Sequence, residues 1–210
     1  MLNPNMTKAE IEIELQKKGD YVKIDYLTRL LEEKQLPIDR KKFVWLKLAE
    51  IYEQKGMLIE AGKMYNNIAV NSIILNDKTQ NHIKEAEMYV KGGAFEYVDE
   101  AVRKALAEAH GSERVDIQNK VRDFYKKQAE FYEKQKKRSN AMKVYEKLLQ
   151  TNISNDEKQE INVKLMSLYE QLGKVKEYFN LKSGVSEQKK KDEKPKSARK
   201  TLADLGIERY

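Results

Sequence analysis

The chain has 210 residues, with 41 Lys or Arg against 34 Asp or Glu and a formal net charge of +7. It has only 9 Gly and 3 Pro, about half the usual share, which disfavours an all-β fold with many tight turns. The lack of Cys excludes disulfides and thiolate metal sites, and no apolar run approaches the roughly 18 residues of a membrane span. The first residues also lack the order of a signal peptide, so we expect a cytoplasmic protein that is not integral to a membrane.

Helices are the expected elements because apolar residues recur at three- and four-residue spacing, as at Leu48 and Ile51. The apolar stretch from Ile68 to Leu75 is ambiguous, but it continues a helical pattern that begins at Leu58. We therefore predict an all-α fold. The predicted helices cover residues 7–17, 21–35, 39–54, 58–75, 78–91, 95–109, 112–135, 139–150, 155–171 and 174–182.

Local start signals support these helices. In a capping box, the side chain of the cap residue accepts a hydrogen bond from the backbone three residues on, where a Glu or Gln side chain reaches back. Three pairs with this spacing mark helix starts: Thr7 with Glu10, Asp77 with Gln80, and Ser154 with Glu157.

The helices are expected in pairs that repeat along the chain. One position recurs at steps of 37, 37, 43 and 37 residues, and a fixed period of this size is typical of helical repeats. The longer step predicts a longer helix within residues 112–135. The aligned residues are Leu15, Tyr52, Tyr89, Tyr132 and Tyr169.

The turn inside each pair is expected four residues after the aligned position. Gly stands there in most pairs, and Gly adopts the left-handed backbone that ends many helices without steric cost. Lys136 replaces Gly in the fourth pair, so we predict that its turn is built differently. The glycines are Gly19, Gly56, Gly93 and Gly173.

Small and aromatic residues also recur inside the pairs, where small ones let two helices approach and aromatic ones fill the gaps. The clearest segments are Trp45, Leu48, Ala49, Tyr52, Gly56, Ala61, Tyr65, Ile68 and then Tyr125, Ala129, Tyr132, Ala141, Tyr145, Leu148. They resemble the tetratricopeptide (TPR) family, although the repeats exceed that family's length of about 34 residues. The resemblance covers roughly residues 7–182 and implies a right-handed α-solenoid of about five helix pairs.

We predict a helical repeat domain at residues 1–182 and a disordered basic tail at residues 183–210. The segment from Ser183 to Lys200 has one large apolar residue, Val185, and cannot offset its ordering entropy by burial. The last ten residues, TLADLGIERY, contain a short amphipathic motif typical of a docking peptide.

Signatures of catalysis are absent from the sequence. It has no phosphate-binding loop, nucleophile elbow or zinc-binding helix motif. The two histidines, His82 and His110, are 28 residues apart, and His82 stands where the repeat has an aromatic residue, which favours a packing role. We therefore expect no enzyme activity, no cofactor and no small-molecule substrate.

In a stack of helix pairs, the first helix of each pair lines a groove that is suited to binding. A column of Glu with a neighbouring ladder of Lys recurs on these helices, so we expect a scaffold or adaptor that binds a peptide or helix of another protein. Lys and Glu at this spacing also stabilise a solvated helix by a few tenths of a kcal/mol without any partner. The predicted partner-binding residues are Leu46, Lys47, Glu50, Glu53, Ile83, Lys84, Glu87, Val90, Lys126, Lys127, Glu130, Glu133, Val163 and Lys164.

Two alternatives stay open. Residues 126–143 hold seven basic and two acidic residues, and with the basic tail they favour an RNA- or ribosome-associated factor. The tyrosines of this region, Tyr125, Tyr132 and Tyr145, are however explained as repeat-core positions. The repeat length suggests, more weakly, a membrane-trafficking adaptor.

Overall fold

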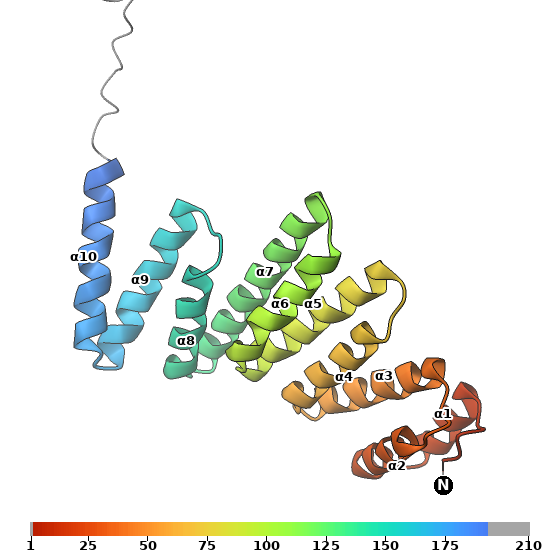
Figure 1. Cartoon of the computed structure of the whole chain (residues 1–210). Coiled ribbons are helices and arrows are strands. Elements are labelled where there is room, and N and C mark those ends of the chain that lie inside the picture. Colours follow the sequence, from red (N-terminus) through yellow and green to blue (C-terminus); the bar gives the residue numbers. More distant parts are fainter. Residues whose placement is uncertain (1, 193–210) are drawn as a thin grey trace, which may run out of the picture. The chain divides into compact units, whose positions relative to one another are not determined.

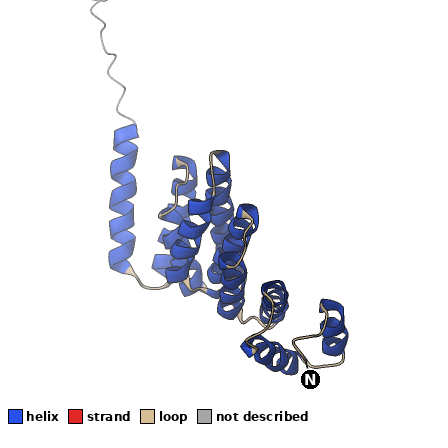
Figure 2. Cartoon of the chain, turned by 45° about the vertical axis from the view of Figure 1, so that its right-hand side comes forward, coloured by secondary structure: helices blue, strands red, loops and turns tan. Residues whose placement is uncertain are grey.

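The computed structural model describes residues 2–192, with side chains as far as Val185, and every regular element in that range is a helix (Figures 1 and 2). The all-α prediction is confirmed. Most of the predicted disordered tail, residues 193–210, lies outside the described residues. The helices are α1 (Lys8–Gln16), α2 (Asp20–Glu32), α3 (Ile38–Gln54), α4 (Leu58–Val70), α5 (Leu75–Gly92), α6 (Phe95–Glu108), α7 (Ser112–Lys134), α8 (Arg138–Leu149), α9 (Asn155–Gln171) and α10 (Val175–Asp192).

The chain divides into two units, Met1–Ile153 and Ser154–Tyr210. In the first unit, helices α2 to α7 each pack on the next helix along the chain, and α5 also packs on α7 (Figure 1). Helix α1 joins a hydrophobic core with α2 and α3. In the second unit, α9 packs on α10. The predicted domain at residues 1–182 spans both units.

Helix α4 ends at Val70, earlier than predicted. The Asn71 side chain donates a hydrogen bond to the carbonyl of Asn67 at 2.8 Å, and the Ser72 hydroxyl donates to that of Ile68 at 2.7 Å. Such side chains compete with the backbone for its hydrogen bonds and favour helix ends. The apolar pattern continued past this point, but the polar pair stops the helix.

Two of the three predicted capping boxes are confirmed. Those at Thr7 and Ser154 have both of their reciprocal hydrogen bonds. The box of Asp77 with Gln80 is wrong, because α5 begins at Leu75 and Asp77 already lies in its first turn.

Helix α10 continues past its predicted end at residue 182 as far as Asp192. Residues 183–192 are therefore helical, where the sequence analysis placed the start of a disordered tail. Glu, Gln and Lys make up half of this stretch, and all three have favourable helix propensity.

Four turns between paired helices share one backbone geometry. Gly56, Gly93 and Gly173 have φ angles of 72°, 72° and 68°. Lys136 has a φ of 57°, so the prediction that its turn is built differently is wrong. Gly19 instead has a φ of −70° and caps the start of α2, so the first pair is the one with a different turn.

In each of these four turns, the residue after the left-handed position donates its backbone N–H to the carbonyl of an aligned Tyr. This bond spans five residues and is typical of a Schellman turn. The longer spacing between two of the tyrosines is taken up by α7, which has 23 residues where α3 has 17. The bonds are Met57 to Tyr52 (2.8 Å), Ala94 to Tyr89 (3.0 Å), Lys137 to Tyr132 (2.9 Å) and Lys174 to Tyr169 (2.8 Å).

The left-handed backbone of Lys136 predicts that Lys136→Gly stabilises the protein. A side chain strains this conformation and Gly does not, and part of the gain is lost to the greater freedom of Gly in the unfolded chain. We expect a gain of about 0.5–1 kcal/mol in the free energy of unfolding, measured by urea denaturation. Lys120→Gly, inside the preceding helix α7, is the control and should destabilise by about 1 kcal/mol. A loss of stability in both variants would contradict the strain argument.

Helices α4 and α5 approach closely at Gly62, a position that the sequence analysis did not single out. A Cβ atom at Gly62 would lie 2.6 Å from Cε1 of Tyr89. The Tyr89 ring is buried, and this burial, with smaller effects of Glu85 and Tyr97, raises the pKa of its phenol to about 12. The small residue therefore fixes the distance between the two helices.

Gly62→Ala should destabilise the protein by about 1–3 kcal/mol, because the added methyl group meets a packed ring. The sign of the change in stability is informative, because Gly to Ala in an unhindered helix stabilises the protein by up to about 1 kcal/mol. Gly184→Ala is the matched control: Gly184 is helical and has open space around its Cα. Thermal and urea denaturation should show opposite shifts, and a gain at Gly62 would show that the helices have room to separate.

Candidate functional site

A groove of about 340 Å³ lies between α5 and α7, next to the first residue of α4. We name it the α5–α7 groove. Two residues of the predicted partner-binding set, one from each helix, are among those that line it. The lining residues are Leu58, Glu87, Lys91, Phe124, Lys127, Gln128 and Phe131.

Helix α7 contributes one continuous face to the groove. Phe124, Lys127, Gln128 and Phe131 follow the spacing i, i+3, i+4, i+7, which places them on one side of a helix. Phe131 is 49% exposed, whereas Gln128 is buried and donates a hydrogen bond to the carbonyl of Lys91 at 3.4 Å. Neither phenylalanine belongs to the predicted binding set, although their spacing is visible in the sequence.

One charge in the groove has no ion pair. The Glu87 carboxylate lies 2.6 Å from the Lys91 ammonium in an i, i+4 pair on α5. Lys127 is exposed and makes no ion pair with any residue that the structure describes. The groove therefore combines apolar surface with one uncompensated positive charge.

Several predicted residues converge on the Tyr65 side chain of α4. Its hydroxyl donates a hydrogen bond of 2.5 Å to Glu53, and the Lys84 ammonium lies 5.1 Å from the centre of its ring. Burial is the main cause that raises the pKa of Tyr65, followed by the bond to Glu53 and the charges of Glu50 and Glu87. The structure thus brings Glu50, Glu53 and Glu87 of the predicted set near one another, but around a buried tyrosine.

Other predicted residues are occupied or covered. The Lys47 ammonium lies 2.8 Å from Glu12 and 3.4 Å from Glu50, and the bond to Glu12 is the main cause that raises the pKa of Lys47. Ile83 and Val90 are 6% and 0% exposed, so they present no surface to a partner. The reason is that α5 packs on α4, α6 and α7, which buries residues on more than one of its faces.

The remaining residues of the predicted partner-binding set lie neither in the α5–α7 groove nor around Tyr65. Val163 and Lys164 are exposed and belong to the second unit, on α9. The others are half-buried or exposed on α3 and α7: Leu46, Lys126, Glu130 and Glu133.

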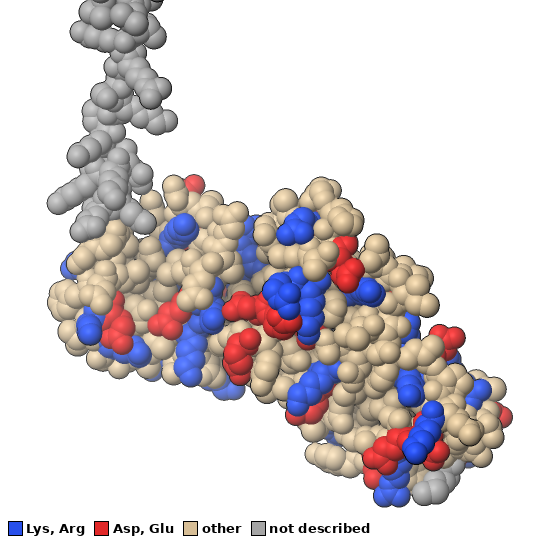
Figure 3. Space-filling model, in the orientation of Figure 1, with Lys and Arg blue, Asp and Glu red and all other residues tan. Residues whose placement is uncertain are grey.

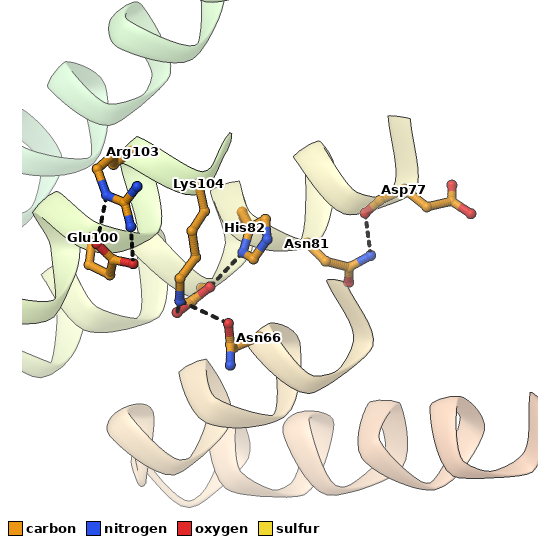
Figure 4. A network of polar contacts seen from close by, with 8 residues as sticks. Asn66, Asp77, Asn81, His82, Glu100, Arg103 and Lys104 are labelled. Carbon is orange, nitrogen blue, oxygen red and sulfur yellow. Dashed lines mark hydrogen bonds and ion pairs between the residues drawn. The ribbon is translucent and has the colours of Figure 1, made fainter. Parts of the chain in front are cut away.

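The contact between His82 and Glu85 is buried and forms part of a polar network (Figure 4). Nδ1 of His82 lies 2.8 Å from the Glu85 carboxylate, and the Lys104 ammonium lies 3.4 Å from that carboxylate and 3.0 Å from the Asn66 amide oxygen. The network joins α5, α6 and α4. His82 and Glu85 are 5% and 2% exposed, so the network serves packing and has no access to a substrate.

Comparisons of the chain with family models, with curated proteins and with solved structures find no match. Among the side chains described, residues 2–185, no group of His, Asp and Glu is placed to hold a metal ion. No helix in the described part of the chain has both the length and the apolarity of a membrane span.

The buried network predicts a large effect of Glu85→Ala. The change leaves His82 and Lys104 without their shared acceptor, at an expected cost of about 3 kcal/mol in urea denaturation. The control is Glu100→Ala, which removes an exposed pair with Arg103 and should leave the denaturation midpoint unchanged. Similar shifts of the urea denaturation midpoint for the two variants would show that the network does not hold the three helices together.

Proposed function

We propose that the chain is a non-enzymatic interaction module whose α5–α7 groove binds a peptide or helix of another protein. The observation that carries this proposal is the exposed apolar surface of Phe131 beside the unpaired Lys127. Apolar area supplies most of the affinity of such sites, and a few charges fix orientation and partner choice. The groove meets both requirements.

The same proposal includes the architecture: a right-handed α-solenoid of long TPR-like repeats. Three observations support it, namely the four equivalent turns, the packing of α2 to α8 in chain order within the first unit, and the placement of the extra residues in α7. Repeats of this kind contact only their neighbours, which leaves extended surfaces free for binding.

The proposed occupant is an amphipathic segment with a large apolar side chain and a carboxylate about one helical turn away. The apolar side chain packs between Phe124 and Phe131, and the carboxylate pairs with Lys127. This is the helix-in-groove mode of recognition, in which anchors spaced along one face supply affinity.

The RNA-binding alternative is less well supported. Tyr125, Tyr132 and Tyr145 are 2%, 9% and 3% exposed, so they offer no ring faces on which bases stack. On the face seen in Figure 3, basic and acidic side chains are interspersed, without one broad basic field. The two proposals differ in salt dependence, because binding through phosphates falls steeply and log-linearly with salt.

Selection of peptides from a random phage-displayed library on the immobilised full-length chain tests the proposal. We expect a consensus with an apolar residue and an acidic residue about one turn apart. Phe131→Ala should lower the affinity for the selected peptides by about ten-fold, which is the loss typical of an interface anchor. Lys127→Glu should change the selected acidic residue to a basic one.

Phe179→Ala is the matched control, because Phe179 is also an exposed aromatic residue but lies on α10. It should leave peptide affinity unchanged. The proposal fails if no consensus emerges, if both phenylalanine variants bind equally well, or if only polyanions bind, with the log-linear salt dependence of phosphate contacts.

A further inference from the structure

Helix α7 is much longer than the helix that pairs with it. It has 23 residues and α8 has 12, so about half of α7 extends beyond α8. A hollow of about 590 Å³ lies along this part of α7, between α6 and the end of α8. We name it the α6–α8 trough, and none of its lining residues belongs to the predicted partner-binding set.

One face of α7 forms the floor of the trough. Arg114, Gln118, Val121 and Tyr125 are spaced i, i+4, i+7, i+11, which is one side of a helix. Val121 and Tyr125 are 6% and 2% exposed, so the deep part of the floor is apolar and aromatic. This face differs from the one that α7 turns to the α5–α7 groove.

Helix α6 forms an apolar wall. Val98, Val102 and Leu106 line the trough at spacing i, i+4, i+8. At a rise of 1.5 Å per residue, this stripe is about 12 Å long, or a little over two helical turns. An elongated apolar stripe of this length suits an extended peptide or a short helix better than a compact ligand.

The hydroxyl of Tyr125 lacks a protein partner. The side chain is 2% exposed, and its hydroxyl makes no hydrogen bond with any residue that the structure describes. Burial is the main cause that raises the pKa of Tyr125, and the charge of Asp99, another residue of the trough, adds to it. Tyr125 itself lines the trough, where an acceptor on a ligand would satisfy its hydroxyl.

The rim of the trough carries three cations, Arg103, Arg114 and Lys147, against one carboxylate, Asp99. The Lys147 ammonium is 3.8 Å from Asp99, and Arg103 pairs with Glu100 outside the trough. Exposed pairs of this kind contribute little free energy, so they exchange readily with the charges of a ligand. The rim therefore favours an acidic ligand.

We propose that the α6–α8 trough is a second docking site, separate from the α5–α7 groove, for an acidic amphipathic helix of a partner protein. The apolar side of that helix packs on Val102 and Leu106 of α6. Its carboxylates pair with the rim cations, and one acceptor takes the hydrogen bond of the Tyr125 hydroxyl.

Fluorescence anisotropy with two labelled synthetic helical peptides tests this site on the full-length chain. Each peptide has about 12 residues with Leu at i, i+4 and i+8, matched to the α6 stripe, and flanks of Glu in one and Lys in the other. The Glu peptide should bind about ten-fold more tightly than the Lys peptide. Lys147→Glu should lower the affinity for the Glu peptide by about ten-fold. Tyr125→Phe, which keeps the buried ring, should lower it by about five-fold.

Lys63→Glu makes the same charge change at an exposed residue of α4 outside both sites, and should leave binding unchanged. Equal affinity of the two peptides, or unchanged binding to both trough variants, overturns the proposal. Loss of binding in Phe131→Ala alone also overturns it, because the peptide then sits in the α5–α7 groove. Binding of sodium dodecanoate without binding of the Glu peptide overturns it in favour of a small amphiphile.

Discussion

A pair of amphipathic helices cannot bury its apolar faces alone, and a tight turn joins the two helices of most pairs in this chain. Four pairs reverse through a left-handed residue, closed by a hydrogen bond to the carbonyl of an aligned tyrosine. The geometry is strict enough that Lys136 adopts it despite the steric cost to a residue with a side chain. The backbone of the turn, more than the identity of its residue, is the constant feature of these pairs.

Helix α5 is where this stacking has its largest consequences. It packs on α4, α6 and α7, approaches α4 closely at Gly62, and carries the buried carboxylate that joins three helices. That burial covers Ile83 and Val90 and leaves Glu87 and Lys91 at the edge of a groove. The same packing therefore stabilises the fold and decides which side chains stay exposed.

The length of α7 links the two proposed binding sites. Its face with Phe124 and Phe131 lines the α5–α7 groove, and its face with Val121 and Tyr125 forms the floor of the α6–α8 trough. The extra turns leave part of α7 beyond the reach of α8, which opens the second hollow. The unequal lengths of α7 and α8 thus create additional surface.

The sequence by itself determined the helices, two of the capping boxes, the long α7 and the position of the turns, because spacing and cap chemistry act over a few residues. It did not reveal which apolar positions face outward. Val90 and Phe131 are both apolar residues on helices, yet Val90 is buried and Phe131 is half exposed. Exposure depends on how many neighbours surround a helix, and α5 has neighbours on more sides than a simple pair predicts. Only the tertiary structure decided that, because burial is set by contacts between residues far apart in the chain.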